Sequence, residues 1–208
     1  MDSLFDSHRI PQNRYPHWAV FETIIDDLHD YSRYVEFHPA NFKTFSVHLT
    51  RLYLSICSEI DVVLKMIYIE LGQTKKRPDI NDYRRALTKA FPNFARVRVT
   101  IRSMDYEITP WDAWASTDDK NPLWWGSYNK VKHERNIHFA HANLENVLHS
   151  AAAFLVALMF LYKDEVQKNR LGPDFRVFGY PSDTAYLIRM GAHLQQQDMS
   201  TISVPRRA

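Results

Sequence analysis

Glycine and cysteine are both scarce in this chain, which contains five glycines and one cysteine among 208 residues. So few glycines argue against a glycine-rich phosphate-binding loop, and neither a G-x-G-x-x-G string nor a P-loop string occurs. The lone cysteine, Cys57, cannot form an intramolecular disulfide, so we expect it to be a buried apolar residue in a reducing compartment. The first residues are acidic where a secretory signal needs basic ones, which predicts a cytoplasmic protein.

Neither sign of charge dominates, because 26 basic residues are balanced by 24 acidic ones and the net charge is +2. This balance gives no general argument for binding to nucleic acid. The most apolar stretch, residues 144–162, carries Glu145, Asn146 and His149 in its first two turns, whereas a membrane-spanning helix needs about 20 apolar residues. We therefore expect a buried core helix and no membrane contact.

The length suits a single domain, which we place at residues 1–194, with an irregular arm at 1–16 and a disordered tail at 195–208. Apolar residues recur at helical spacing in residues 21–31, 41–71, 82–91 and 143–162. Strand patterns and a weak terminal helix are expected at residues 97–101, 106–109, 175–180 and 185–194. The predicted fold class is mainly α, a helical bundle of four to five helices with a small inserted β-hairpin.

The residues best suited to catalysis or ligand binding lie in residues 121–149, just before the apolar stretch and in its first turns. Asn121 followed by Pro122 predicts an N-cap and the start of a helix. On that helix, 3.6-residue periodicity places two polar stripes side by side. One stripe holds Tyr128, Lys132 and Arg135, and the other holds Asn129, His133 and Asn136.

The string R-N-I-H-F-A-H, from Arg135 to His141, resembles the signature of the HEPN superfamily, in which an Arg is followed by four to six residues, the first often Asn, and then by a His. The resemblance implies a helical bundle in which two long helices pack together, here residues 41–71 and 143–162. The string W-W-x-x-Y-N-x-V-K-H-x-R also resembles one found in poorly characterised bacterial and phage helical proteins. The two resemblances agree on Arg135, but the first favours His141 and the second favours His133.

Many HEPN proteins are metal-independent endoribonucleases that act as dimers, so the resemblance implies an RNA-binding protein and possible ribonuclease in a toxin or phage-defence setting. The implied partners are RNA, a second copy of the chain and a protein such as an antitoxin, with no cofactor and no metal. A His can transfer protons near neutral pH, and an Arg can hold a phosphate bidentately. The implied catalytic residues are Arg135, Asn136, His141 and His133, and the implied substrate-binding residues are Lys132, Asn129, Tyr128 and His138.

Other interpretations of the same residues remain open. On an unbroken helix Arg135 and His141 do not share a face, so either the helix breaks near His138 or His141 serves a partner's site. His138, His141 and Glu145 have a spacing that could hold zinc, but no H-E-x-x-H string occurs. A function of another class is a non-catalytic interaction module, in which the Trp and Tyr cluster organises the bundle or a partner groove.

Overall fold

The computed structural model describes residues 14–116, 118–168, 170–171 and 176–179. The predicted fold class is confirmed, because the described chain is mainly helical and includes one small antiparallel sheet. The α-helices are α1 (Pro16–Tyr31), α2 (Val47–Glu70), α3 (Ile80–Ala90), α4 (Leu123–His138), α5 (Leu144–Leu161) and α6 (Lys163–Gln167). The tail at 195–208, the weak helix at 185–194 and most of the arm at 1–16 lie outside the described residues.

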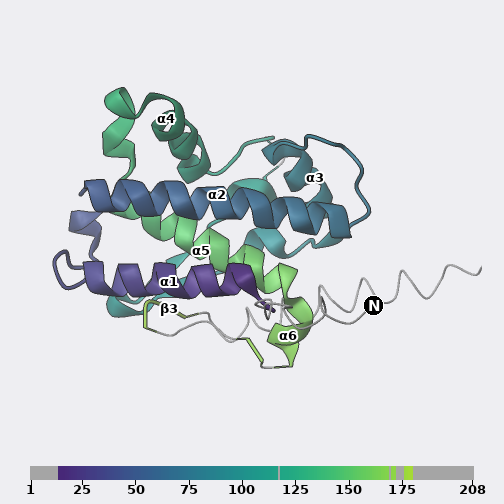
Figure 1. Cartoon of the computed structure of the whole chain (residues 1–208), viewed down its shortest axis with the longest axis horizontal. Coiled ribbons are helices and arrows are strands. Elements are labelled where there is room, and N and C mark those ends of the chain that lie inside the picture. Colours follow the sequence, from purple (N-terminus) through teal and green to yellow (C-terminus); the bar gives the residue numbers. More distant parts are fainter. Residues whose placement is uncertain (1–13, 117, 169, 172–175, 180–208) are drawn as a thin grey trace, which may run out of the picture.

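Helix α5 forms the centre of the bundle. It packs most extensively on α2, and Figure 1 shows it behind and between α1 and α2, with α4 on the opposite side of α2 from α1. Every residue from Leu144 to Phe160 except Glu145, Asn146 and His149 is buried. Among the described helices, α5 alone is long and apolar enough to cross a membrane, and 83% of it is buried inside the protein, as a core helix requires.

An aromatic cluster fixes α4 and the preceding loop against α5. Trp111 is fully buried, and its ring lies 4.3 Å from that of Trp114 and 5.1 Å from that of Trp124, between ring centroids. Its indole Nε1 donates to the Ala153 carbonyl of α5 at 3.2 Å, and the Trp124 indole Nε1 donates to the Pro110 carbonyl at 2.8 Å. Each indole therefore buries its apolar surface and still satisfies its N–H group.

The three-stranded sheet has β1 (Val99–Ile101) in the centre, between β2 (Tyr106–Ile108) and β3 (Phe178–Gly179). Both pairings are antiparallel, so the predicted hairpin is confirmed, and the strand predicted for residues 175–180 is present at Phe178–Gly179 within the described residues. Val99 and Ile101 are buried, while Arg98 on the outer side pairs with Glu107 at 2.9 Å. The alternation of the sequence thus turns one face of the sheet toward the core.

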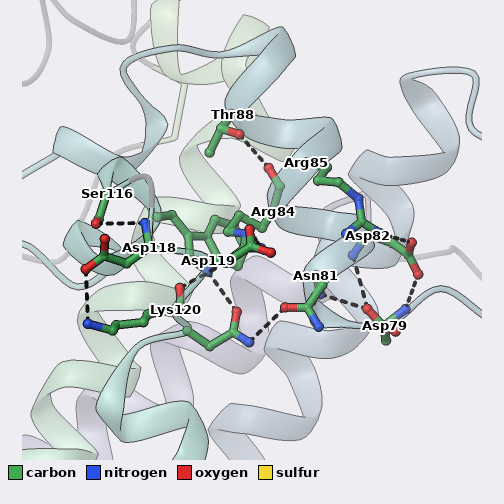
Figure 2. Close-up of polar contacts among 12 residues, drawn as sticks. Asp79, Asn81, Asp82, Arg84, Arg85, Thr88, Ser116, Asp118, Asp119 and Lys120 are labelled. Atoms are coloured by element: carbon green, nitrogen blue, oxygen red, sulfur yellow. Dashed lines mark hydrogen bonds and ion pairs between the residues drawn. The ribbon is translucent and has the colours of Figure 1, made fainter.

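Polar contacts join α3 to the loop that precedes α4 (Figure 2). The Asp79 side chain caps α3, and Asp82 completes a capping box with it. The buried guanidinium of Arg84 pairs with Asp119 and donates to the Lys120 carbonyl at 3.2 Å. Asn121 does not cap α4, because its Oδ1 accepts from the Trp114 indole Nε1 at 3.3 Å while its Nδ2 donates to the Asn81 side chain at 3.0 Å, and the prediction of that cap was wrong.

The long helix predicted for residues 41–71 begins later than expected. Residues Pro39–Asn41 form one 3-10 turn, and α2 begins at Val47 with the Ser46 side chain as its cap. The segment in between is held to the start of α5, because the Leu144 N–H donates to the Thr44 carbonyl at 2.9 Å. The prediction from hydrophobic periodicity included residues 42–46, which the start of α5 holds in a non-helical conformation.

Candidate functional site

Helix α4 is bent inside the polar segment. Glu134 has φ −137° and ψ 53°, which is not helical, and the α-helix ends at His138 before a 3-10 turn over Phe139–His141. Asn143 then begins α5, and its side chain accepts from the Asn146 N–H at 3.0 Å. Of the two alternatives for Arg135 and His141, the break near His138 is present. The two polar stripes predicted for an unbroken helix consequently do not continue past Glu134.

Tyr128 lies in the core rather than at the surface. It is buried, its ring meets that of Tyr53 edge to face at 6.2 Å, and burial raises its pKa to about 12. The ammonium group of Lys132 lies over the Tyr128 ring, 5.5 Å from its centroid. Tyr128 therefore supports Lys132 by a cation–π contact and has little surface left for a substrate.

Arg135, Asn136 and His133 are all exposed. No hydrogen bond or ion pair joins any of the three to another residue in the described part of the chain. Glu59, which could have locked Arg135 in a structural pair, instead lies 2.9 Å from His17 Nδ1. The guanidinium of Arg135 is thus open to a ligand or to a second molecule.

His138 and His141 are brought together by the bend. Their ring centroids lie 5.5 Å apart, edge to face. His138 Nε2 lies 3.4 Å from the Glu134 carboxylate, and His141 Nδ1 lies 3.4 Å from the Ser127 hydroxyl. Burial, followed by the positive charges of Lys130, His138 and Lys43, lowers the pKa of His141 below its ordinary value. One imidazole therefore faces a carboxylate, and the other is kept neutral.

His141 lies on the wall of a cleft between the first turns of α4 and α5, with a volume of about 880 Å³. A cleft of this size suits a small-molecule ligand or one unit of a polymer. Of the predicted site residues, His141 and Asn129 line it, whereas Arg135, Asn136, His133, Lys132, Tyr128 and His138 do not. The remaining lining includes Lys43, Gly126, Ser127, Lys130, Asn146 and His149.

Two of these lining residues escaped prediction for different reasons. The ammonium group of Lys43 binds the Glu145 carboxylate at 2.5 Å. The two residues are about a hundred positions apart, so no local sequence pattern predicts this contact. His149 interrupts the apolar pattern of α5, and that interruption was the available signal. Burial lowers the pKa of His149, and its ring forms no hydrogen bond with the described residues. A neutral imidazole here offers one donor and one acceptor to the cleft.

The structure bears on the zinc interpretation and on the role of the tryptophans. His138, His141 and Glu145 do not form a metal-binding group, and no three His, Cys, Asp or Glu side chains do so among the residues that the structure describes. The tryptophans Trp111, Trp114, Trp124 and Trp125 are buried, so they organise the bundle, and Trp124 and Trp125 also line the cleft. Comparison of the chain with protein-family models, with curated proteins and with solved structures finds no match.

Proposed function

We propose that this protein is an RNA-binding, metal-independent endoribonuclease of HEPN-like character, with its reaction centre at the bend between α4 and α5. The observation that carries the proposal is the pair of imidazoles of His138 and His141, 5.5 Å apart in unlike surroundings. A neutral imidazole can accept a proton and a protonated one can donate a proton, so such a pair can serve both steps of RNA cleavage.

The chemistry follows from the surroundings of each ring. His141, whose pKa is lowered, takes the proton of a ribose 2′-hydroxyl, and the 2′-oxygen attacks the adjacent phosphorus. The bond from phosphorus to the 5′-oxygen breaks, and protonated His138, beside the Glu134 carboxylate, gives a proton to that leaving oxygen. The products are a 2′,3′-cyclic phosphate and a 5′-hydroxyl. Lys130 at the cleft and the exposed guanidinium of Arg135 supply positive charge for the phosphate.

The products of a single-stranded RNA provide the test. We expect cleavage in the presence of EDTA, a 2′,3′-cyclic phosphate at each new 3′ end, and no cleavage of the same sequence with 2′-O-methyl groups. The reason is that the 2′-hydroxyl is the nucleophile and no metal is required. End-group analysis by mass spectrometry checks this result. Products with 5′-phosphates, or activity abolished by EDTA, would contradict the proposed mechanism.

A second copy of the chain is the partner that we propose for the apolar surface beside the reaction centre. Phe45, Val47, Ile137 and Phe139, here called the apolar patch, are 49%, 67%, 64% and 45% exposed. Phe45 and Phe139 come from different elements, and their rings meet at 5.3 Å. The patch includes neighbours of Arg135 and Asn136 in the chain, so two copies joined through it would bring two such motifs close together.

Replacement of Phe139 by Asp is expected to convert the dimer into a monomer, because a carboxylate in an apolar interface loses its hydration without gaining a partner. Sedimentation velocity at several concentrations measures the change. Tyr34→Asp is the matched control, since Tyr34 is 86% exposed and lies outside the patch. A wild-type chain that stays monomeric at high concentration would overturn the dimer. The patch would then be open to a protein partner such as an antitoxin.

A further inference from the structure

Gly126 has no evident role within the protein. It lies inside α4, where glycine is less favourable than alanine, and its backbone does not adopt a positive φ. A Cβ built at this position would meet no atom within 4 Å, so packing does not require glycine either. The residue is exposed and lines the cleft. Its effect is to leave one position of the α4 wall of the cleft without a side chain.

The side chains around this open wall match a nucleobase. His149 is neutral and presents a ring without a hydrogen-bond partner among the described residues, and the exposed amide of Asn129 is likewise without one. Imidazole and amide groups offer donors and acceptors without net charge, which suits the edge of an uncharged heteroaromatic ring. Lys130 supplies positive charge in the same cleft for an attached phosphate, whereas the Lys43 ammonium group is paired with Glu145, and the Asp112 side chain also lines the cleft.

We infer that the cleft between α4 and α5 binds one unpaired nucleotide of the RNA strand, with the base seated against Gly126 and His149 and its phosphate toward Lys130. This inference rests on the proposed function, because His141 lines the same cleft and would act on a phosphate next to the bound nucleotide. The cleft volume of about 880 Å³ accommodates a single nucleotide but not a duplex. The seated base would therefore select single-stranded RNA and set the position of the scissile bond.

Substitutions at Gly126 separate ligand binding from stability. Gly126→Ala is expected to raise the thermal midpoint, because alanine is the better helix former, and to weaken RNA binding at the same time. Gly126→Leu fills the cleft more completely and is expected to raise the Kd by at least about tenfold. Ser58→Leu, at an exposed position in α2 outside the cleft, is the matched control for a leucine on a helix surface. A purely structural role of Gly126 would not raise the thermal midpoint and weaken RNA binding in the same variant.

Binding is measured with the full-length chain and a fluorescently labelled single-stranded 2′-O-methyl RNA, which cannot be cleaved. In parallel, the imidazole NMR signals of His149 are followed with nucleoside 3′-monophosphates and with ribose 5-phosphate. The inference expects the nucleotides to move these signals in the wild type and not in Gly126→Leu, and expects ribose 5-phosphate to leave them in place. Equal effects of nucleotide and ribose phosphate would show phosphate binding alone and would overturn it.

Two outcomes distinguish this inference from the proposed function. If wild type and Gly126→Leu bind the RNA equally while the wild type cleaves unmodified RNA, the strand passes outside the cleft; the inference fails and the nuclease stands. If binding depends on Gly126 but unmodified RNA is not cleaved, the nucleotide site stands and the nuclease fails. A third result would also overturn the inference: free nucleotides shift the His149 signals, but Gly126→Leu does not change RNA binding. The cleft would then bind free nucleotides and not a nucleotide within an RNA strand.

Discussion

Alanine in place of His141 is expected to slow RNA cleavage by about 100- to 10,000-fold, the range typical for loss of a general base. The reason is that His141 is the half-buried imidazole in the cleft, and burial together with Lys130, His138 and Lys43 keeps it neutral. Its ring contacts are the 3.4 Å approach to the Ser127 hydroxyl and the edge-to-face contact with His138, so the fold should be retained. Initial rates with a fluorogenic single-stranded RNA, alongside thermal melting, provide the measurement.

His133→Ala is the matched control, because His133 is exposed on the same helix but does not line the cleft. We expect it to retain near wild-type rates, which would assign the motif histidine to His141 rather than His133. If His133→Ala loses activity and His141→Ala does not, the reaction centre lies elsewhere on α4. Arg135→Ala should lower the rate without changing the melting temperature, since Arg135 has no partner in the described part of the chain.

The pH dependence of cleavage gives a second measure of His141. A general base must be unprotonated, so the rate should rise with pH as the imidazole loses its proton. Because the pKa of His141 is lowered, the midpoint of this acid limb should lie below the ordinary histidine value of 6.5. Residual cleavage by His141→Ala should lack that limb. A wild-type midpoint above 6.5 would contradict the role of His141 as the base.

Replacement of Trp111 by Ala is expected to lower the free energy of unfolding by about 3–5 kcal/mol, the usual cost of removing a large buried aromatic side chain. Trp111 is fully buried and joins three elements, because it packs on Trp114 and Trp124 and donates to the Ala153 carbonyl at 3.2 Å. Its loss leaves a cavity between the loop before α4 and the middle of α5. Urea denaturation followed by circular dichroism measures the change.

Trp111→Phe is the control for the cavity. It keeps an aromatic ring in the cluster and loses the indole N–H, so it should cost clearly less than alanine. If alanine and phenylalanine are equally destabilising, the hydrogen bond to Ala153 rather than the packing carries the effect. A cost below about 1 kcal/mol for alanine would show that the site collapses around the cavity, contrary to the density of aromatic contacts seen there.

Local patterns in the chain were enough to predict the bundle. The apolar run in residues 144–161 has too few polar residues for a surface helix, and it is the central helix α5. Alternation at Val97, Val99 and Ile101 predicted the strand, because side chains of a strand point alternately to its two faces. Cys57 and the tryptophans are buried, as their apolar side chains and their neighbours in the sequence indicated.

Contacts between distant residues decided what local patterns missed. The late start of α2 depends on hydrogen bonds from the start of α5 to residues 42 and 44, and the pairing of Glu59 with His17 joins α2 to α1. The cap of α4 was assigned wrongly because the Asn121 side chain accepts from Trp114 and donates to Asn81 of α3. Each of these errors concerns a polar group whose partner is far away in the sequence.

The sequence by itself determined which segments are helices and strands, since hydrophobic periodicity and capping act over a few neighbouring residues. It also placed the conspicuous cations, imidazoles and amides ahead of the central helix. Tertiary structure alone decided which of them meet: the bend at Glu134 pairs His138 with His141, the cleft selects His141 and Asn129, and Lys43 and His149 join from other segments. The physical reason is that a bend or a cleft is set by packing between elements, which no short stretch of residues encodes.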